Sequence, residues 1–102
     1  MKKLVRDKIP EFATYASYRQ LKPDEREDAL KNKIVEEANE VKAAPDDQNL
    51  LEELADVYTV LEAFLDFKNI SKEDLLKQVE AKKAEKGGFT KFLLMNNISL
   101  NK

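Results

Sequence analysis

Apolar residues recur at helical spacing along most of the chain, and prolines and glycines divide this pattern into segments. Within residues 23–43, Leu30, Ile34 and Val41 fall on one stripe at about 100° per residue. Pro45 interrupts the pattern. A second stripe then runs to about residue 67, and its members are Leu50, Leu54, Val57, Tyr58, Leu61 and Leu65. The pattern predicts long helices over residues 23–43 and about 46–67.

Two shorter helices are predicted on either side of this pair. The opening residues are typical of an extended lead-in, and Pro10 suits the first position of a helix over about 10–20. Ser71 followed by Asp74 resembles a capping box, and Gly87 is a natural C-terminal stop, so a helix is predicted between them. The apolar residues at 89–95 indicate a packed loop or a short extended segment.

These elements predict an all-α protein, a four-to-five-helix bundle. At 102 residues the chain is expected to form one domain, over residues 1–95, with a loose C-terminal tail over 96–102. Val60 and Ala63 lie away from the main stripe of their helix, where one small core does not reach them. We therefore expect a homo-oligomer, either a homodimer or a homotetramer.

The composition excludes several kinds of chemistry. The sequence contains no cysteine and no histidine, so thiol nucleophiles, imidazole bases and zinc sites built on these residues are excluded. A net charge of −2 argues against binding to a nucleic-acid polymer, which needs a basic face. No apolar run is long enough to span a membrane, and no signal-peptide pattern opens the chain, so a cytoplasmic protein without membrane contact is expected.

Two pairs of acidic residues lie within or beside the apolar stripes. Glu37 falls within the stripe of the first long helix, with Glu40 one turn away, and Glu53 and Asp56 repeat this spacing on the second. An unpaired carboxylate is costly to remove from water, so something must compensate these groups. A single such pair is common on solvated helix faces, but two pairs on consecutive helices favour a metal site.

The position of Pro45 brings the two pairs to a similar height. Glu37 and Glu53 lie at equal sequence distances on either side of it, so an antiparallel hairpin would place them opposite one another. Four facing carboxylates repel unless cations intervene. With oxygen ligands alone, the candidate ions are Mg²⁺, Mn²⁺ and Ca²⁺.

Several charged residues are candidates for contact with a phosphate or with water. Lys33 lies one turn before Glu37 and could bind a phosphate or remain an ordinary solvated lysine. Glu36 could act as a base beside the metal, although a surface charge is the simpler interpretation. Further phosphate-binding candidates, each also interpretable as surface charge, are Arg6, Lys8 and Lys86.

The arrangement Lys33-x-x-Glu36-Glu37-x-x-Glu40, followed after twelve residues by Glu53-x-x-Asp56, resembles a known signature. It is the E-x-x-E…E-x-x-D pattern of the all-α nucleoside triphosphate pyrophosphohydrolases. This superfamily includes MazG-type enzymes, phosphoribosyl-ATP pyrophosphohydrolases and dimeric dUTPases. The opening KLVRDKIPE and the later KGGF are similar to the phosphoribosyl-ATP pyrophosphohydrolase-like branch. The resemblance covers roughly residues 2 to 94.

The resemblance implies a MazG-like bundle that cleaves a (d)NTP between its α- and β-phosphates, giving a monophosphate and pyrophosphate. It implies Mg²⁺ as cofactor, with Mn²⁺ as a possible substitute, and the metal ligands would be Glu37, Glu40, Glu53 and Asp56. Catalysis would involve Glu37 and Glu53, assisted by Lys33 and Glu36. The motifs do not show the selectivity of the histidine-pathway enzyme, which favours a housekeeping enzyme of the nucleotide pool.

A second hypothesis needs no catalysis. The acidic cluster could hold a structural cation within a helical interaction module, or it could receive a basic partner. Thermal melts distinguish the two hypotheses, because Mg²⁺ and a non-hydrolysable nucleotide should together stabilise only an enzyme.

Overall fold

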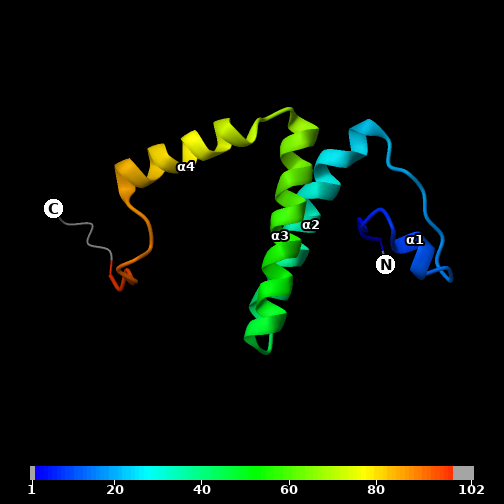
Figure 1. The fold of residues 1–102 in the computed structure, drawn as a ribbon, viewed down its shortest axis with the longest axis horizontal. Helices are drawn as coiled ribbons and strands as arrows, with labels where there is room; N and C mark the ends of the chain where they lie inside the picture. Colours follow the sequence, from blue (N-terminus) through cyan, green and yellow to red (C-terminus); the bar gives the residue numbers. More distant parts are fainter. Residues whose placement is uncertain (1, 98–102) are drawn as a thin grey trace. The chain divides into compact units, whose positions relative to one another are not determined.

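The regular structure in the described part of the chain is entirely helical, with irregular segments between the helices. A computed structural model describes residues 2–97 and contains α1 (Ile9–Phe12), α2 (Pro23–Ala43), α3 (Asp47–Lys68) and α4 (Lys72–Lys86) (Figure 1). Within those residues there is no strand, which confirms the all-α class. None of the described helices is both long and apolar enough to cross a bilayer.

The chain divides into two compact units, the first ending at Ile70 and the second beginning at Ser71. The assignment of residues 1–95 to one domain stays a prediction. Of the tail expected over 96–102, residues 98–102 lie outside the described part of the chain.

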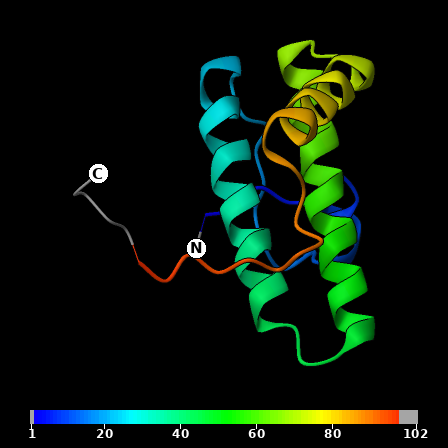
Figure 2. The same ribbon diagram turned by 90° about the vertical axis from the view of Figure 1, so that its left-hand side faces the viewer.

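Helices α2 and α3 form an antiparallel hairpin, seen most clearly in Figure 2. Pro23 occupies the first turn of α2, where the Glu25 carboxylate accepts a hydrogen bond from the backbone N–H of Lys22 (2.9 Å). A three-residue turn leads to α3. There the Asp46 carboxylate caps the helix by accepting from the backbone N–H of Asn49 (2.8 Å). Both helices begin and end within about one residue of the predicted bounds.

The packed face of the hairpin differs from the predicted one. Leu30 and Val60 are its buried apolar residues, 7% and 9% exposed. The prediction that Val60 lies away from the packed stripe is therefore wrong. Leu54 and Tyr58, assigned to that stripe, are instead about half exposed (49% and 47%). Helix α3 is apolar on more than one side, and its periodicity alone does not determine which side meets α2.

Helix α1 is much shorter than predicted. It ends at Phe12, and the backbone N–H of Ala13 closes the last turn on the carbonyl of Ile9 (2.8 Å). The Tyr18 hydroxyl then donates to the Ala13 carbonyl (2.7 Å), which in a continuing helix would accept from the backbone of Ser17. The prediction of a helix over 10–20 is therefore wrong. The Ala13 carbonyl accepts its hydrogen bond from the Tyr18 side chain rather than from the backbone of a further helical turn.

The second unit follows its predicted signals more closely. The Ser71 hydroxyl accepts from the backbone N–H of Asp74 (3.0 Å), and α4 ends at Lys86, just before Gly87, whose φ of +84° suits glycine. The segment after it is not packed within this unit. Its apolar side chains are 78–91% exposed, at Phe89, Phe92, Leu93, Leu94 and Met95.

Candidate metal and phosphate site

Three carboxylates from the two sides of the hairpin converge. One oxygen from each of Glu37, Glu53 and Asp56 lies within 4.8 Å of the others. Glu37 is buried, at 8% exposure, whereas the other two are half-buried. The juxtaposition expected from the position of Pro45 is therefore present. Glu40 is exposed and outside this group of three, so its part in holding an ion stays a prediction.

Negative charge is least compensated at Glu53. The pKa of Glu53 is raised by burial, and further by the charges of Asp56, Glu40 and Glu37. Among the described residues, no lysine or arginine forms an ion pair with Glu53. A cation bound beside Glu53 would relieve this repulsion directly.

Lys33 compensates the α2 side of the cluster. Its Nζ lies 3.2 Å from Oε1 of Glu37 and forms a closer ion pair with Glu36. Partial burial opposes the charge of Lys33, but hydrogen bonds and ion pairs with both glutamates outweigh it and raise the pKa of the amine. The residue predicted to contact a phosphate thus forms ion pairs with two acidic side chains.

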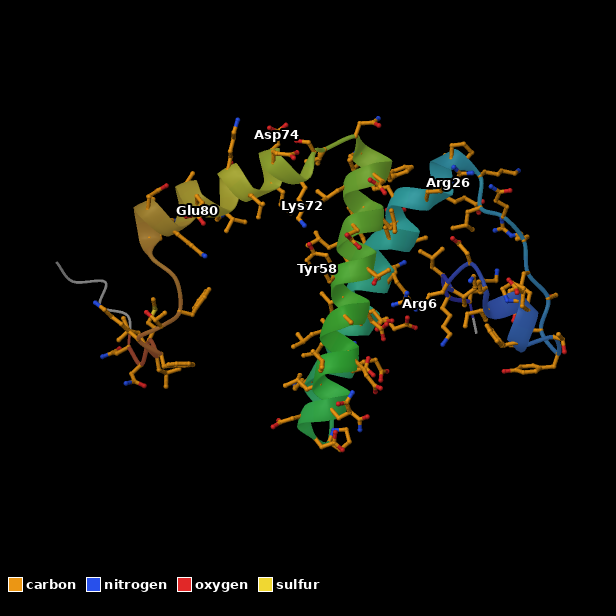
Figure 3. The ribbon with its side chains drawn as sticks, in the orientation of Figure 1. Arg6, Arg26, Tyr58, Lys72, Asp74 and Glu80 are labelled. Atoms are coloured by element: carbon orange, nitrogen blue, oxygen red, sulfur yellow. The ribbon has the colours of Figure 1, made fainter. Side chains whose placement is uncertain are left out.

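Arg6 compensates the α3 side. Its Nη2 donates to Oδ1 of Asp56 (2.6 Å) and, at longer range, to Oγ1 of Thr59 (3.4 Å). The Thr59 hydroxyl donates its own proton to the carbonyl of Ala55 (2.9 Å), which leaves its oxygen free to accept. Figure 3 shows Arg6 and Tyr58 on opposite sides of α3. Sequence patterns identified Arg6 only as a phosphate-binding candidate, because no local signal connects it with α3.

The other two phosphate-binding candidates lie away from these contacts. Lys8 is exposed at the start of α1, and no ion pair of its side chain is found in the described part of the chain. Lys86 is exposed at the end of α4, in the second unit, where it lines a hollow formed by its own segment as far as Leu93. The roles expected for Lys8 and Lys86 stay predictions.

The donor set of the cluster fits a hard divalent cation. All three groups are carboxylates, which suit Mg²⁺ and Mn²⁺ better than softer metals. An octahedral Mg²⁺ with ligands at about 2.1 Å places its ligand oxygens at most about 4.2 Å apart. Since the three oxygens lie within 4.8 Å, a small side-chain rotation brings them into range.

The all-helical fold and the carboxylate cluster across its hairpin agree with the MazG-like all-α superfamily. The family model of phosphoribosyl-ATP pyrophosphohydrolase matches residues 1–83, so the chain belongs to that family. Membership supports a nucleotide pyrophosphohydrolase activity and confirms the resemblance recognised in the sequence. The KGGF motif lies beyond the match. Searches of curated proteins and of solved structures found no significant match.

Proposed function

We propose that the protein hydrolyses a (d)NTP or related nucleotide between its α- and β-phosphates, releasing a monophosphate and pyrophosphate, as housekeeping of the nucleotide pool. One observation supports this most directly, namely the convergence of Glu37, Glu53 and Asp56. The features of the site described above suit a metal ion and a phosphate chain, which all nucleotides share. A broad nucleotide substrate is therefore proposed ahead of phosphoribosyl-ATP alone.

The proposed cofactor is Mg²⁺, with Mn²⁺ as a possible substitute, held by the three clustered carboxylates and by Glu40. When bound, such an ion neutralises phosphate charge and lowers the pKa of a nearby water. Glu37 is the least exposed of these ligands, and its helix fixes it opposite Glu53 and Asp56. Because the surrounding protein rather than water contacts most of its side chain, Glu37 is the proposed ligand whose position is most firmly fixed.

The chain's own residues also provide for the proton and for the phosphate charge. Water attacks either the α- or the β-phosphorus, and the anhydride bond between the two phosphates breaks. The attacking water must lose a proton in this step. Glu36, adjacent to Glu37 and held by Lys33, is the proposed acceptor of that proton. Lys33 and Arg6 are proposed to contact phosphate oxygens. Lys8 and Lys86 are proposed for the same role from the sequence alone, because no contact found in the first unit connects either residue with the acidic cluster.

The hairpin also supports the proposal of a homodimer or homotetramer. Only Leu30 and Val60 are buried apolar residues in the described part of the chain. An apolar face of α3, formed by Leu51, Leu54 and Tyr58, is 47–62% exposed. Burial of apolar area stabilises a protein by about 25 cal/mol per Å², so covering this face with a second copy is favourable. The active site is then proposed to take residues from both subunits.

The test is a screen of purified protein for pyrophosphate release from common and damaged (d)NTPs and phosphoribosyl-ATP, with and without Mg²⁺. Glu37→Gln and Asp56→Asn should lower kcat/KM at least about 100-fold while circular dichroism stays unchanged. Full activity in both variants overturns the proposed site. If adding Mg²⁺ together with a non-hydrolysable nucleotide leaves the melting temperature unchanged, the helical interaction module is favoured instead.

A further inference from the structure

We propose that Arg6 is an exchangeable counter-ion: it pairs with Asp56, yields that carboxylate to a divalent cation when one binds, and then binds a phosphate of the nucleotide. The final step rests on the proposed function. The first two steps concern only the binding of a cation to this protein and are testable without any reaction.

The contact itself joins distant parts of the chain. Arg6 belongs to the irregular segment before α1, fifty residues from Asp56 in sequence, yet its Nη2 lies 2.6 Å from Oδ1 of that residue. The same carboxylate supplies one of the three clustered oxygens. A guanidinium and a divalent cation therefore compete for one acidic group, and each repels the other.

Exposure distinguishes Arg6 from the other cation at the cluster. The side chain of Arg6 is 56% exposed, and its partner Asp56 is 36% exposed. The side chain of Lys33, by contrast, is 15% exposed, and the side chain of its partner Glu37 is 10% exposed. Because water can replace the contacts of Arg6 at little cost, Arg6 can leave its carboxylate more readily than Lys33 can leave Glu37.

The remaining donors of Arg6 suit a phosphate. Its contacts with Asp56 and Thr59 both use Nη2, and in the described residues Nη1 and Nε make no hydrogen bond. A guanidinium binds phosphate oxygens in a two-pronged arrangement that a lysine does not reproduce. The Thr59 oxygen, whose own proton is donated to Ala55, gives Arg6 an acceptor beside the site after it leaves Asp56.

This exchange predicts opposite effects of one substitution on two ligands. For Arg6→Ala, Mn²⁺ binding in the absence of nucleotide, followed by calorimetry or by electron paramagnetic resonance, should tighten about two- to fivefold. That range corresponds to the loss of one exposed ion pair. Binding of a non-hydrolysable nucleotide at saturating Mn²⁺ should weaken at least about tenfold.

Matched variants separate charge from structure. Arg6→Gln keeps a hydrogen-bond donor without the charge and should behave like Arg6→Ala, which guards against loss of folding in either variant. Arg6→Lys keeps the charge and should leave Mn²⁺ affinity within about twofold, with nucleotide binding only partly restored. Lys3→Ala removes a charge from the same segment and should change neither affinity by more than about twofold.

The outcomes are distinguishable. Unchanged or weaker Mn²⁺ binding in both Arg6→Ala and Arg6→Gln overturns the competition and leaves Arg6 a structural anchor. If the same variants bind Mn²⁺ more tightly but bind the nucleotide as well as the wild type does, the proposal that Arg6 moves to a phosphate is overturned. If the wild-type protein releases no pyrophosphate from any nucleotide while Arg6→Ala still tightens Mn²⁺ binding, the proposed function fails and the competition for Asp56 stands.

Discussion

The amine of Lys33 lies 3.2 Å from Oε1 of Glu37, one helical turn further along α2, and this pair holds the most buried carboxylate of the acidic cluster. Arg6 makes the corresponding pair with Asp56 on α3. Glu53, the third member of the cluster, has no ion pair among the described residues. A basic side chain therefore compensates the charge of Glu37 and of Asp56 but not that of Glu53.

Replacing Lys33 by methionine should destabilise the metal-free protein by about 1–3 kcal/mol, since Glu37 is left buried without its charged partner. Urea unfolding in the presence of EDTA measures this loss, and added Mg²⁺ should recover part of it. Lys31→Met is the matched control. Lys31 pairs with Glu27 on an exposed surface, so its loss should change stability by at most about 0.5 kcal/mol. Equal stability of the two variants would contradict the role assigned to Lys33.

Glu37→Gln should separate metal binding from folding. The neutral amide relieves repulsion with Glu53 and Asp56, so the melting temperature in EDTA should equal or exceed that of the wild type. The rise in melting temperature on adding Mg²⁺ should fall by more than half, because a ligand of the ion is lost. Glu62→Gln, an exposed position on α3, is the control and should keep the full rise. A Glu37→Gln protein with an undiminished response to Mg²⁺ argues against an ion at this site.

Stability should depend on acid pH through the start of α2. Arg19 binds both oxygens of Glu25 (2.9 and 2.8 Å), and with the N–H of Lys22 it lowers the pKa of Glu25 from 4.5 to about 2. A carboxyl whose pKa is lower in the folded state stabilises it above its unfolded pKa, and this stabilisation is lost as pH falls toward the folded value.

Thermal melts should therefore show wild type above Glu25→Gln at pH 7, with the difference shrinking from about pH 4.5 down to about pH 2. Glu62→Gln again serves as the control and should show no such narrowing. A difference that stays constant over this range is the contrary result.

The exposed face of α3 gives a test of assembly. Leu54→Lys places a charge in the middle of the apolar face formed with Leu51 and Tyr58, where a partner copy would have to desolvate it. Light scattering should show the wild type as a dimer or tetramer at micromolar concentration and the variant as a monomer. Leu76→Lys changes a similarly exposed leucine of α4 and should leave the assembly intact. A wild-type monomer refutes the proposal.

The long helices could be predicted because their ends carry strong local signals. Pro23, the Asp46 cap, the Ser71 cap and Gly87 all act within a few residues of the boundary they set. The end of α1 depends instead on the hydroxyl of Tyr18, a contact that no periodicity reveals. Apolar spacing alone therefore extended that helix too far.

Some contacts of the candidate site could likewise be predicted from the sequence, and others could not. Glu37 and Glu53 could be placed opposite one another because the hairpin geometry follows from the chain itself. The contact of Arg6 with Asp56 arises from the folding of an irregular segment back onto α3, which no spacing rule describes. The choice of Val60 for the packed face was missed for a related reason, since helix α3 offers more than one apolar side.

The three-residue turn between α2 and α3 has a further consequence for how the chain reaches its native state. Because all three clustered carboxylates lie between positions 37 and 56, they meet as soon as this hairpin closes, an early event for contacts so near in sequence. Mutual repulsion then opposes closure unless a cation is present. Stopped-flow refolding should accelerate with millimolar Mg²⁺, so the ion would guide the nascent hairpin before any nucleotide is bound.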